Sequence, residues 1–269
     1  MFYSVIILPL LVILLDSEVH AIDVMQVGTV PEKECFGTSY RFGYSGTRQD
    51  HYDSLRTRYE GCTVVRGNLE LTIMDDPTVT YDLNFLRSIR IVTGYVLIGL
   101  TTVDVIPLVN LQMIRGDNLF RLMQRDYALA VVVTASVNQT TGLGQLLMPA
   151  LREISRGQVV FTLNPLLCFV QTILWDVIIK QHASPVVYSG MPLEQNCEEC
   201  DDACVVDGEK HCWGPGADNC QQVPSLTTCP NSCRNGCYQG SNQIRCCHSQ
   251  CAGGCWGPQP KRLSAVQIF

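Results

Sequence analysis

Cysteine is the residue type in this sequence that most clearly predicts chemistry. Fifteen of the 269 residues are cysteine, and twelve of these lie from Cys197 to Cys255. Clustered thiols either pair as disulfides or bind zinc as thiolates, and the spacing Cys197-x-x-Cys200 is compatible with both. Zinc sites need free thiolates and usually a reducing compartment, so this density favours disulfides in an oxidising one. We therefore expect a disulfide-bonded module, because residues 197–255 lack the apolar periodicity of a core.

The N-terminus predicts export to such a compartment. Residues 4–15 are almost wholly apolar, and Val19 and Ala21 stand at the −3 and −1 positions of a cleavage site. This pattern is typical of a secretory signal peptide over residues 1–21, since the apolar run is too short for a membrane anchor. Residues 94–114 include Asp104 and Pro107, which argue against a membrane span. We expect the secretory pathway and an extracellular location, with no membrane span in this chain.

Charge and motifs exclude several classes of function. The net charge is −6, and no run of Lys and Arg is longer than two, which argues against nucleic-acid binding. Gly142-Leu143-Gly144 lacks the third glycine and the lysine of a phosphate-binding loop, and no kinase motif appears. We interpret His51 and Asp53 as a surface pair rather than part of a catalytic triad. The sequence predicts no enzyme, no catalytic residue, no cofactor and no metal.

The elements that position these cysteines are short apolar strands that recur through residues 35–196. Leu86-x-x-Ile89 followed by 94–98 is echoed by Leu151-x-x-Ile154 followed by 157–161, with further apolar runs at 106–114 and 127–133. Such runs, each followed by turn residues, predict one strand per coil of a β-solenoid, whose coils must stack to bury their apolar sides. An α/β domain with a parallel sheet is the alternative, but it needs a helix of ten or more residues between strands. Glycine and proline interrupt several of these gaps.

Longer motifs are more specific than this periodicity. Residues 35–39, 67–72, 81–86, 94–98, 110–116, 127–131 and 164–168 read CFGTS, GNLELT, YDLNFL, GYVLI, NLQMIRG, YALAV and NPLLC. They are followed by CWGPG at 212–216, CCH at 246–248 and CAGGC at 251–255. In this order the motifs resemble the N-terminal ectodomain of the epidermal growth factor receptor (ErbB) family, with a receptor L domain over 32–196 and the start of a furin-like cysteine-rich domain over 197–258. Residues 259–269 lack the family pattern and are expected to be an unrelated tail.

The resemblance implies a fold and a disulfide pairing. The fold is mainly β, a right-handed β-solenoid followed by a disulfide-rich furin-like module. The implied pairs are Cys35–Cys62, Cys168–Cys197, Cys200–Cys212, Cys204–Cys220, Cys229–Cys237, Cys233–Cys246 and Cys247–Cys255. This scheme leaves Cys251 as a free thiol, which tends toward a disulfide-linked dimer in an oxidising compartment.

The resemblance also implies a function. In the family this segment binds an EGF-like growth factor, whose strand adds to an edge of the L domain while apolar side chains anchor it. The positions that match are Phe42, Tyr44 and Gly46 on the edge segment, then Ile73, Leu100 and Val132 on the solenoid face. The family archetype differs in residue type at Phe42, Tyr44 and Ile73, so the identity of the ligand stays open.

Three readings of the whole chain remain open. It is a growth-factor-binding segment of a receptor tyrosine kinase ectodomain, truncated before the second L domain, the membrane span and the kinase; or a secreted decoy that sequesters ligand; or, in another class, a cysteine-rich matrix or protease-inhibitor protein. The motifs argue against the last. Asn138-Gln139-Thr140 is a sequon that predicts N-glycosylation at Asn138 in a secreted protein.

Overall fold

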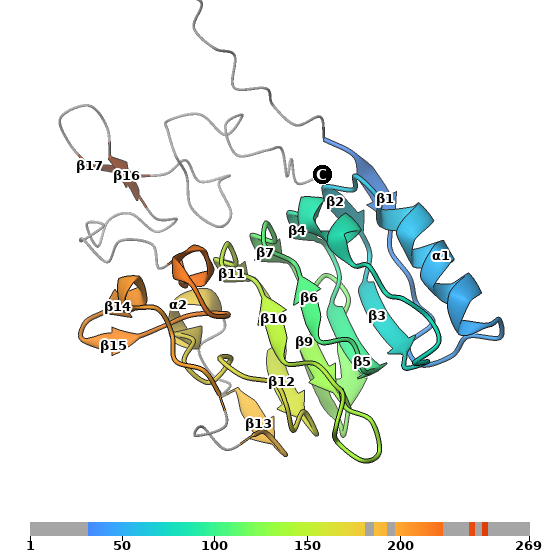
Figure 1. Ribbon diagram of the computed structural model, residues 1–269. Helices are drawn as coiled ribbons and strands as arrows, with labels where there is room; N and C mark the ends of the chain where they lie inside the picture. Colours follow the sequence, from blue (N-terminus) through green and yellow to red (C-terminus); the bar gives the residue numbers. More distant parts are fainter. Residues whose placement is uncertain (1–31, 181–185, 193–196, 223–236, 240–243, 247–269) are drawn as a thin grey trace, which may run out of the picture. The chain divides into compact units, whose positions relative to one another are not determined.

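The computed structural model describes residues 32–180, 186–192, 197–222, 237–239 and 244–246 (Figure 1). Within these ranges most regular structure is β-strand. The α-helices described are α1 (Arg48–Tyr59) and α2 (Trp175–Ile178), and the short 3₁₀ helices are η1 (Asn84–Ser88), η3 (Asp202–Cys204) and η4 (Ala217–Asn219).

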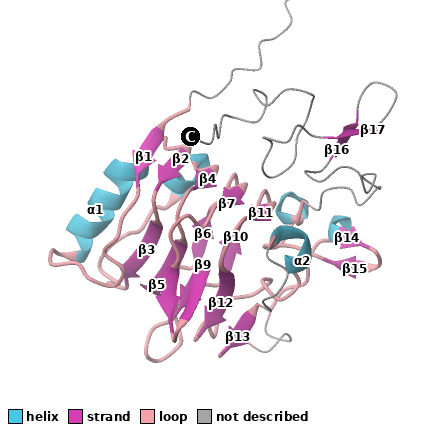
Figure 2. Ribbon diagram, turned by 180° about the vertical axis from the view of Figure 1, so that it is seen from behind, coloured by secondary structure: helices cyan, strands magenta, loops and turns pink. Residues whose placement is uncertain are grey.

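The largest sheet carries the face on which a ligand is expected. Its parallel strands follow the order β13-β12-β9-β5-β3, and β8 pairs with β9 in the antiparallel sense. Figure 2 shows β3, β5, β9 and β12 lying side by side. The bounds are β3 (Leu69–Met74), β5 (Val96–Thr101), β8 (Phe120–Leu122), β9 (Arg125–Val132), β12 (Gln158–Thr162) and β13 (Val187–Ser189).

Two smaller parallel sheets complete the coils. One has the order β1-β2-β4-β7-β11, and the other pairs β6 with β10. The bounds are β1 (Glu34–Phe36), β2 (Val64–Arg66), β4 (Ile91–Val92), β7 (Met113–Ile114), β11 (Glu153–Ile154), β6 (Val105–Pro107) and β10 (Gln145–Leu147). The chain visits the sheets in turn, through β4, β5 and β6 and then β7, β9 and β10, so each coil lies on the one before it. Helix α1 lies between the paired strands β1 and β2, and α2 lies between β12 and β13, but no α-helix joins the described strands from β2 to β12. The predicted mainly β fold is therefore confirmed and the α/β alternative is wrong.

In-register stacking builds the core of the coils. Leu71, Ile98, Val131 and Phe161 pair in one row across β3, β5, β9 and β12, and all four are fully buried. Tyr188 on β13 continues this row, and its ring stacks on that of Phe161 with centroids 5.6 Å apart. Because side chains alternate between the two faces of a strand, the neighbouring residues form a separate row on the outer face.

Helix α1 begins at a capping box and covers the first coils. Thr47 Oγ1 accepts a hydrogen bond from the Asp50 backbone N–H at 3.1 Å, and the Asp50 carboxylate accepts one from the Thr47 backbone N–H at 3.2 Å. Both bonds satisfy donors that a helix start leaves unpaired. His51, Leu55 and Tyr59 follow at four-residue spacing, so one face of the helix is buried.

The cysteine-rich part depends on covalent bonds. Its described hairpins are short: β14 (Val205–Val206) pairs with β15 (Glu209–Lys210), and β16 (Cys237–Gln239) with β17 (Ile244–Cys246). Apart from Trp213, the buried apolar cluster of this part consists of Phe169 and cystine sulfurs. Disulfides therefore replace a side-chain core here, as expected for a segment with little apolar surface to bury.

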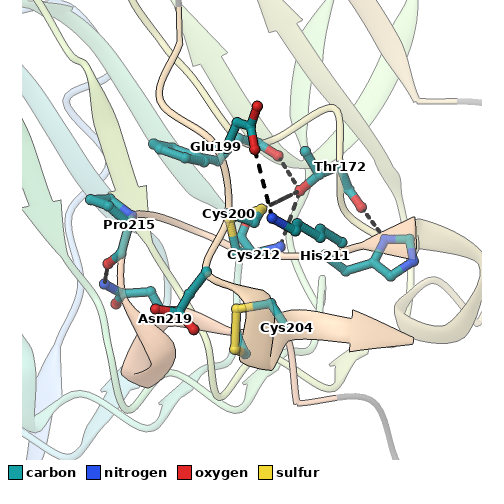
Figure 3. The surroundings of a disulfide bond; sticks show 12 residues. Thr172, Glu199, Cys200, Cys204, His211, Cys212, Pro215 and Asn219 are labelled. Atoms are coloured by element: carbon teal, nitrogen blue, oxygen red, sulfur yellow. Dashed lines mark hydrogen bonds and ion pairs between the residues drawn. A yellow bond between two sulfur atoms is a disulfide. The ribbon is translucent and has the colours of Figure 1, made fainter. Parts of the chain in front are cut away.

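The first cysteine-rich residues are attached directly to the last coil. The Thr172 hydroxyl donates to the Cys212 carbonyl and accepts from the Cys212 N–H, both at 3.1 Å, while the Thr172 carbonyl is bonded to Nδ1 of His211 (Figure 3). Trp213 is fully buried in the solenoid core, edge-on to Trp175 with ring centroids 5.5 Å apart. One indole thus fills space between the two parts of the chain.

We expect Trp213→Ala to lower the free energy of unfolding by about 3–5 kcal/mol, because it leaves a cavity the size of an indole. Urea unfolding followed by circular dichroism measures this. The control is Val205→Ala, since Val205 lies in the same module and is exposed, so its substitution changes stability by no more than about 0.5 kcal/mol. Equal midpoints for the two variants would contradict the role of Trp213.

Candidate ligand-binding face

The edge segment, residues 38–46, is attached to Asn68 and to two alternate residues of the outermost strand β3, Glu70 and Thr72. Thr38 bridges Asn68 in the antiparallel sense, with the Thr38 N–H donating to the Asn68 carbonyl at 2.9 Å. The Tyr40 N–H donates to the Glu70 carboxylate at 2.7 Å. Further along, Thr72 Oγ1 donates to the Arg41 carbonyl at 2.7 Å. The edge segment therefore follows β3 before it turns toward helix α1.

A buried carboxylate holds this attachment. Glu70 is buried, and its second oxygen accepts a hydrogen bond from the Tyr95 hydroxyl at 2.6 Å. Burial raises the pKa of Tyr95 above its ordinary value, and the adjacent Glu70 carboxylate raises it further. The Tyr95 hydroxyl therefore keeps its proton and remains a donor. Sequence reasoning missed Glu70, although an acidic residue within an apolar strand was a signal available for it.

Phe42 and Val132 meet over a glycine. A Cβ on Gly99 would lie 2.9 Å from Cε1 of Phe42 and 2.6 Å from the Val132 carbonyl oxygen, so only glycine fits between them. The Phe42 ring also packs edge-on against Phe120, with centroids 6.1 Å apart. The ring of Phe42 therefore rests on the large sheet over Gly99, and Gly99 and Phe120 join the site although the sequence did not single them out.

Tyr44 and Gly46 face helix α1 instead. The ring of Tyr44 lies 4.4 Å from that of His51, centroid to centroid, and a Cβ on Gly46 would lie 2.7 Å from Cε1 of Tyr44. His51 is buried, and its Nε2 lies 2.8 Å from the Thr72 carbonyl. Because a carbonyl can only accept, Nε2 carries the proton. The expected surface pair of His51 with Asp53 is therefore wrong: burial against β3 removes His51 from the surface, and Asp53 accepts from Gln49.

The face positions differ in exposure. Leu100 and Phe42 each expose 38% of their surface, whereas Ile73 and Val132 are buried. Gly99 pairs with both Thr72 and Val132, so Leu100 comes one residue further along β5 than this row. The structure therefore brings Phe42, Leu100 and Val132 together, with Val132 beneath the surface, and places Tyr44 and Gly46 beside α1.

The sequon lies in an exposed loop. Asn138 Oδ1 accepts from the Thr140 hydroxyl at 2.9 Å and from the Ser136 hydroxyl at 2.7 Å. The loop is closed by an antiparallel bridge between Ala135 and Gly142. The side chain of Asn138 is therefore reachable from solvent on a tight turn.

Four disulfides lie in the described ranges, and each belongs to the implied scheme. They are Cys35–Cys62, Cys168–Cys197, Cys200–Cys212 and Cys204–Cys220. Cys197 and Cys200 are thus bonded to different cysteines, which removes the thiolates that zinc would need. Cys246 is also disulfide-bonded. Three implied pairs involve side chains outside the described residues: Cys229–Cys237, Cys233–Cys246 and Cys247–Cys255. Cys251, the signal peptide 1–21 and the tail 259–269 also lie outside the described residues.

The described helices are all too short or too polar to cross a membrane. Two protein families match the chain. The receptor L domain matches residues 61–179, and the furin-like cysteine rich region matches residues 189–269. Neither match is to a kinase domain; both are to ectodomain regions of receptor kinases.

Curated relatives agree with these matches. The epidermal growth factor receptor of Drosophila melanogaster is 39% identical over 241 residues, which is 89% of this chain and 16% of the relative. That of Gallus gallus is 39% identical over 218 residues, 81% of this chain and 29% of the relative. The receptor tyrosine-protein kinase erbB-2 of Mus musculus is 35% identical over 253 residues, 90% of this chain and 19% of the relative. The chain spans less than a third of the length of these relatives.

Two adjacent family matches, together with this identity over most of the chain, show that the chain belongs to the epidermal growth factor receptor (ErbB) family.

Proposed function

We propose that this chain binds an EGF-like growth factor through Phe42 and Leu100 and the edge segment beside them. The observation that carries the proposal is a pair of exposed apolar side chains on a rigid sheet, fixed from below by Gly99 and the buried Glu70. Large apolar anchors on preorganised surfaces supply most of the affinity of protein interfaces. The name of two relatives, epidermal growth factor receptor, supports the same class of ligand.

The edge segment offers backbone groups to a ligand strand. Among the residues that the structure describes, none exchanges a hydrogen bond with the backbone of Phe42 or Tyr44. An added strand gains affinity through main-chain hydrogen bonds and specificity through side-chain pockets. We infer that a growth-factor strand pairs here while its apolar side chains contact Leu100.

The chemistry of the chain supports an extracellular place of action. Its disulfides persist in oxidising compartments and not in the cytosol. The exposed sequon at Asn138 is accessible to the glycosylation machinery of the secretory pathway.

The first test is Leu100→Asp, which we expect to weaken binding of an EGF-like domain at least about 30-fold, or about 2 kcal/mol, because a charge replaces an apolar anchor. Leu100 has a φ of 48°, a conformation that Asp tolerates better than Leu, so the variant should fold. Surface plasmon resonance against a panel of EGF-like domains that includes epidermal growth factor measures the affinity. Met123→Asp is the matched control, since Met123 is exposed at a φ of 47° on the β8–β9 turn. Unchanged affinity for Leu100→Asp would reject the site.

The second test uses the pH dependence of His51. Burial lowers the pKa of His51 below its ordinary value of 6.5, and nearby Arg48 lowers it further, while the bond to the Thr72 carbonyl opposes this. The unfolded chain therefore takes up this proton at a higher pH than the folded chain. The stability that the neutral ring contributes is complete above about pH 6.5 and is lost as the pH falls from there toward the folded-state pKa.

His51→Gln isolates this contribution, because the amide can donate to Thr72 but does not titrate. We expect the difference in the free energy of unfolding between the protein and His51→Gln to shrink as the pH falls from 7.5 to 5. Urea unfolding across this range measures it. A difference that is constant with pH would show that His51 is not held neutral in the fold.

The third test concerns Asn138. Expressed in a eukaryotic secretory host, the chain should lose mass on treatment with an amidase that removes N-glycans. Asn138→Gln and Thr140→Ala should abolish that loss, whereas Gln139→Ala should retain it, because only the first and third positions are read. A glycan-free Asn138 in the unmodified chain would refute the assignment.

A further inference from the structure

A polar cavity of about 660 Å³ opens where β3 and β5 begin, and neither Phe42 nor Leu100 lines it. Asn68 and Tyr95, the residues directly before these two strands, form part of its wall. The rest of the wall comes from the edge segment, from the turn 116–119 after β7, from β9 and from the turn that follows β11. Cavities of this volume hold small molecules. Here the polar groups that would select one come from segments far apart in the sequence.

Arg41 enters this cavity from a strained and fixed backbone. Its φ is 55°, a conformation that is uncommon for residues other than glycine, Asn and Asp. The peptide groups around it are held, because the Tyr40 N–H donates to the Glu70 carboxylate and the Arg41 carbonyl accepts from Thr72 Oγ1. Burial raises the pKa of Tyr95, and the Arg41 guanidinium, which is hydrogen-bonded to the Tyr95 hydroxyl, opposes part of that rise. Strain that positions a charged group in a cavity is a pointer to function.

The turn 116–119 is also positioned before any ligand arrives. Gly116 has a φ of 67°, and a Cβ there would lie 2.4 Å from the Arg156 carbonyl oxygen, so only glycine allows the two turns to approach. The Asp117 carboxylate bonds to Arg115 at 3.3 Å and to Arg156 at 3.0 Å. These contacts fix this part of the wall and already engage the charge of Asp117.

Two other charges of the cavity are not engaged in this way. Within the part of the chain that the structure describes, neither Arg41 nor Asp126 forms an ion pair. Arg121 lies opposite Asp126 in the register of β8 and β9 but is not bonded to it. Glu70 accepts from the Tyr40 N–H and the Tyr95 hydroxyl instead. The cavity therefore offers one cation and one anion to a ligand.

We propose that this cavity binds a small zwitterion, an α-amino acid or a short peptide, whose carboxylate pairs with Arg41 and whose ammonium group pairs with Asp126. A planar guanidinium can hold a carboxylate through two parallel hydrogen bonds, and an ammonium group donates to carboxylate oxygens. A ligand with a charge of one sign only would leave Arg41 or Asp126 without a partner. The Ser39 hydroxyl and the Asn118 amide line the same cavity and can bond to the remaining polar groups of the ligand. Such a ligand binds independently of a growth factor, because neither Phe42 nor Leu100 holds it.

Free amino acids and dipeptides are the probes that test this site on the full chain. We expect at least one member of such a panel to raise the melting temperature, because a ligand that binds only the folded state stabilises it. Isothermal titration calorimetry then gives its affinity. Its N-acetyl and C-amide derivatives, each of which lacks one of the two charges, should bind at least about tenfold more weakly. Equal affinity for either derivative would overturn the assignment.

Charge-removing variants test the two protein groups. Arg41→Asn removes the cation and suits the left-handed backbone, and Asp126→Asn removes the anion at nearly constant size. Each should weaken binding of that panel member at least about tenfold. Arg56→Gln and Asp207→Asn are the matched controls, since they remove the same charges at exposed positions outside the cavity.

Each result decides the matter. Weak binding by both cavity variants with normal binding by both controls supports the zwitterion site. Normal binding by either cavity variant overturns it, and so does equal weakening by the controls, which would make the effect one of net charge. An unmodified chain that binds no panel member also overturns it. None of these results bears on growth-factor binding, which Leu100→Asp tests separately.

Discussion

Parallel pairing in register between successive coils is the constraint on which the rest of this structure depends. When Leu71, Ile98, Val131 and Phe161 fall in one line, each coil buries its apolar residue on that of its neighbour. The same line fixes what faces outward, because a slip of one residue would exchange the two faces of a strand. The core and the candidate ligand-binding face are therefore two consequences of one register.

The edge segment adds a second level of order to this frame. It is not a strand of the sheet, and it is held largely through side chains of β3. Glu70 accepts from the Tyr40 N–H and the Tyr95 hydroxyl, so a buried carboxylate obtains the partners that its burial requires. Removing those partners would leave a buried charge unpaired, which is costly. The edge segment is therefore held firmly at Tyr40, and this fixes the position of Phe42, two residues further on, over Gly99.

The sequence predicted the coils well and the face less completely. Runs of aliphatic and β-branched residues indicated strands because each run must be buried, and the cysteine density indicated a module without a core. Position within the face could not be derived in this way. Leu100 and Val132 both belong to apolar runs, yet Leu100 is exposed and Val132 is buried, and even Ile73, which is equivalent to Leu100 in register, is buried. Exposure here depends on what packs over each residue, and an apolar run does not reveal that. His51 was misread because the sequence shows only its near neighbour Asp53. Its actual partner, the carbonyl of Thr72, lies on β3 and is brought close only by the fold.

Backbone strain and side-chain exposure together distinguish the residues that the fold requires from those that it does not. The residues that follow Thr72, Gly99, Val132, Thr162 and Ser189 on the large sheet all have a positive φ. Gly190 is the residue type that this conformation favours, and at Ile73 burial compensates for the strain. Leu100, Val133 and Leu163 have the same conformation but leave 38%, 37% and 56% of their surface exposed, so burial compensates less fully for the strain there. A solenoid with polar residues at these three positions would satisfy the same register and bury the same core. Coil stacking therefore fixes the backbone conformation at these positions, whereas the core does not fix which side chains stand there.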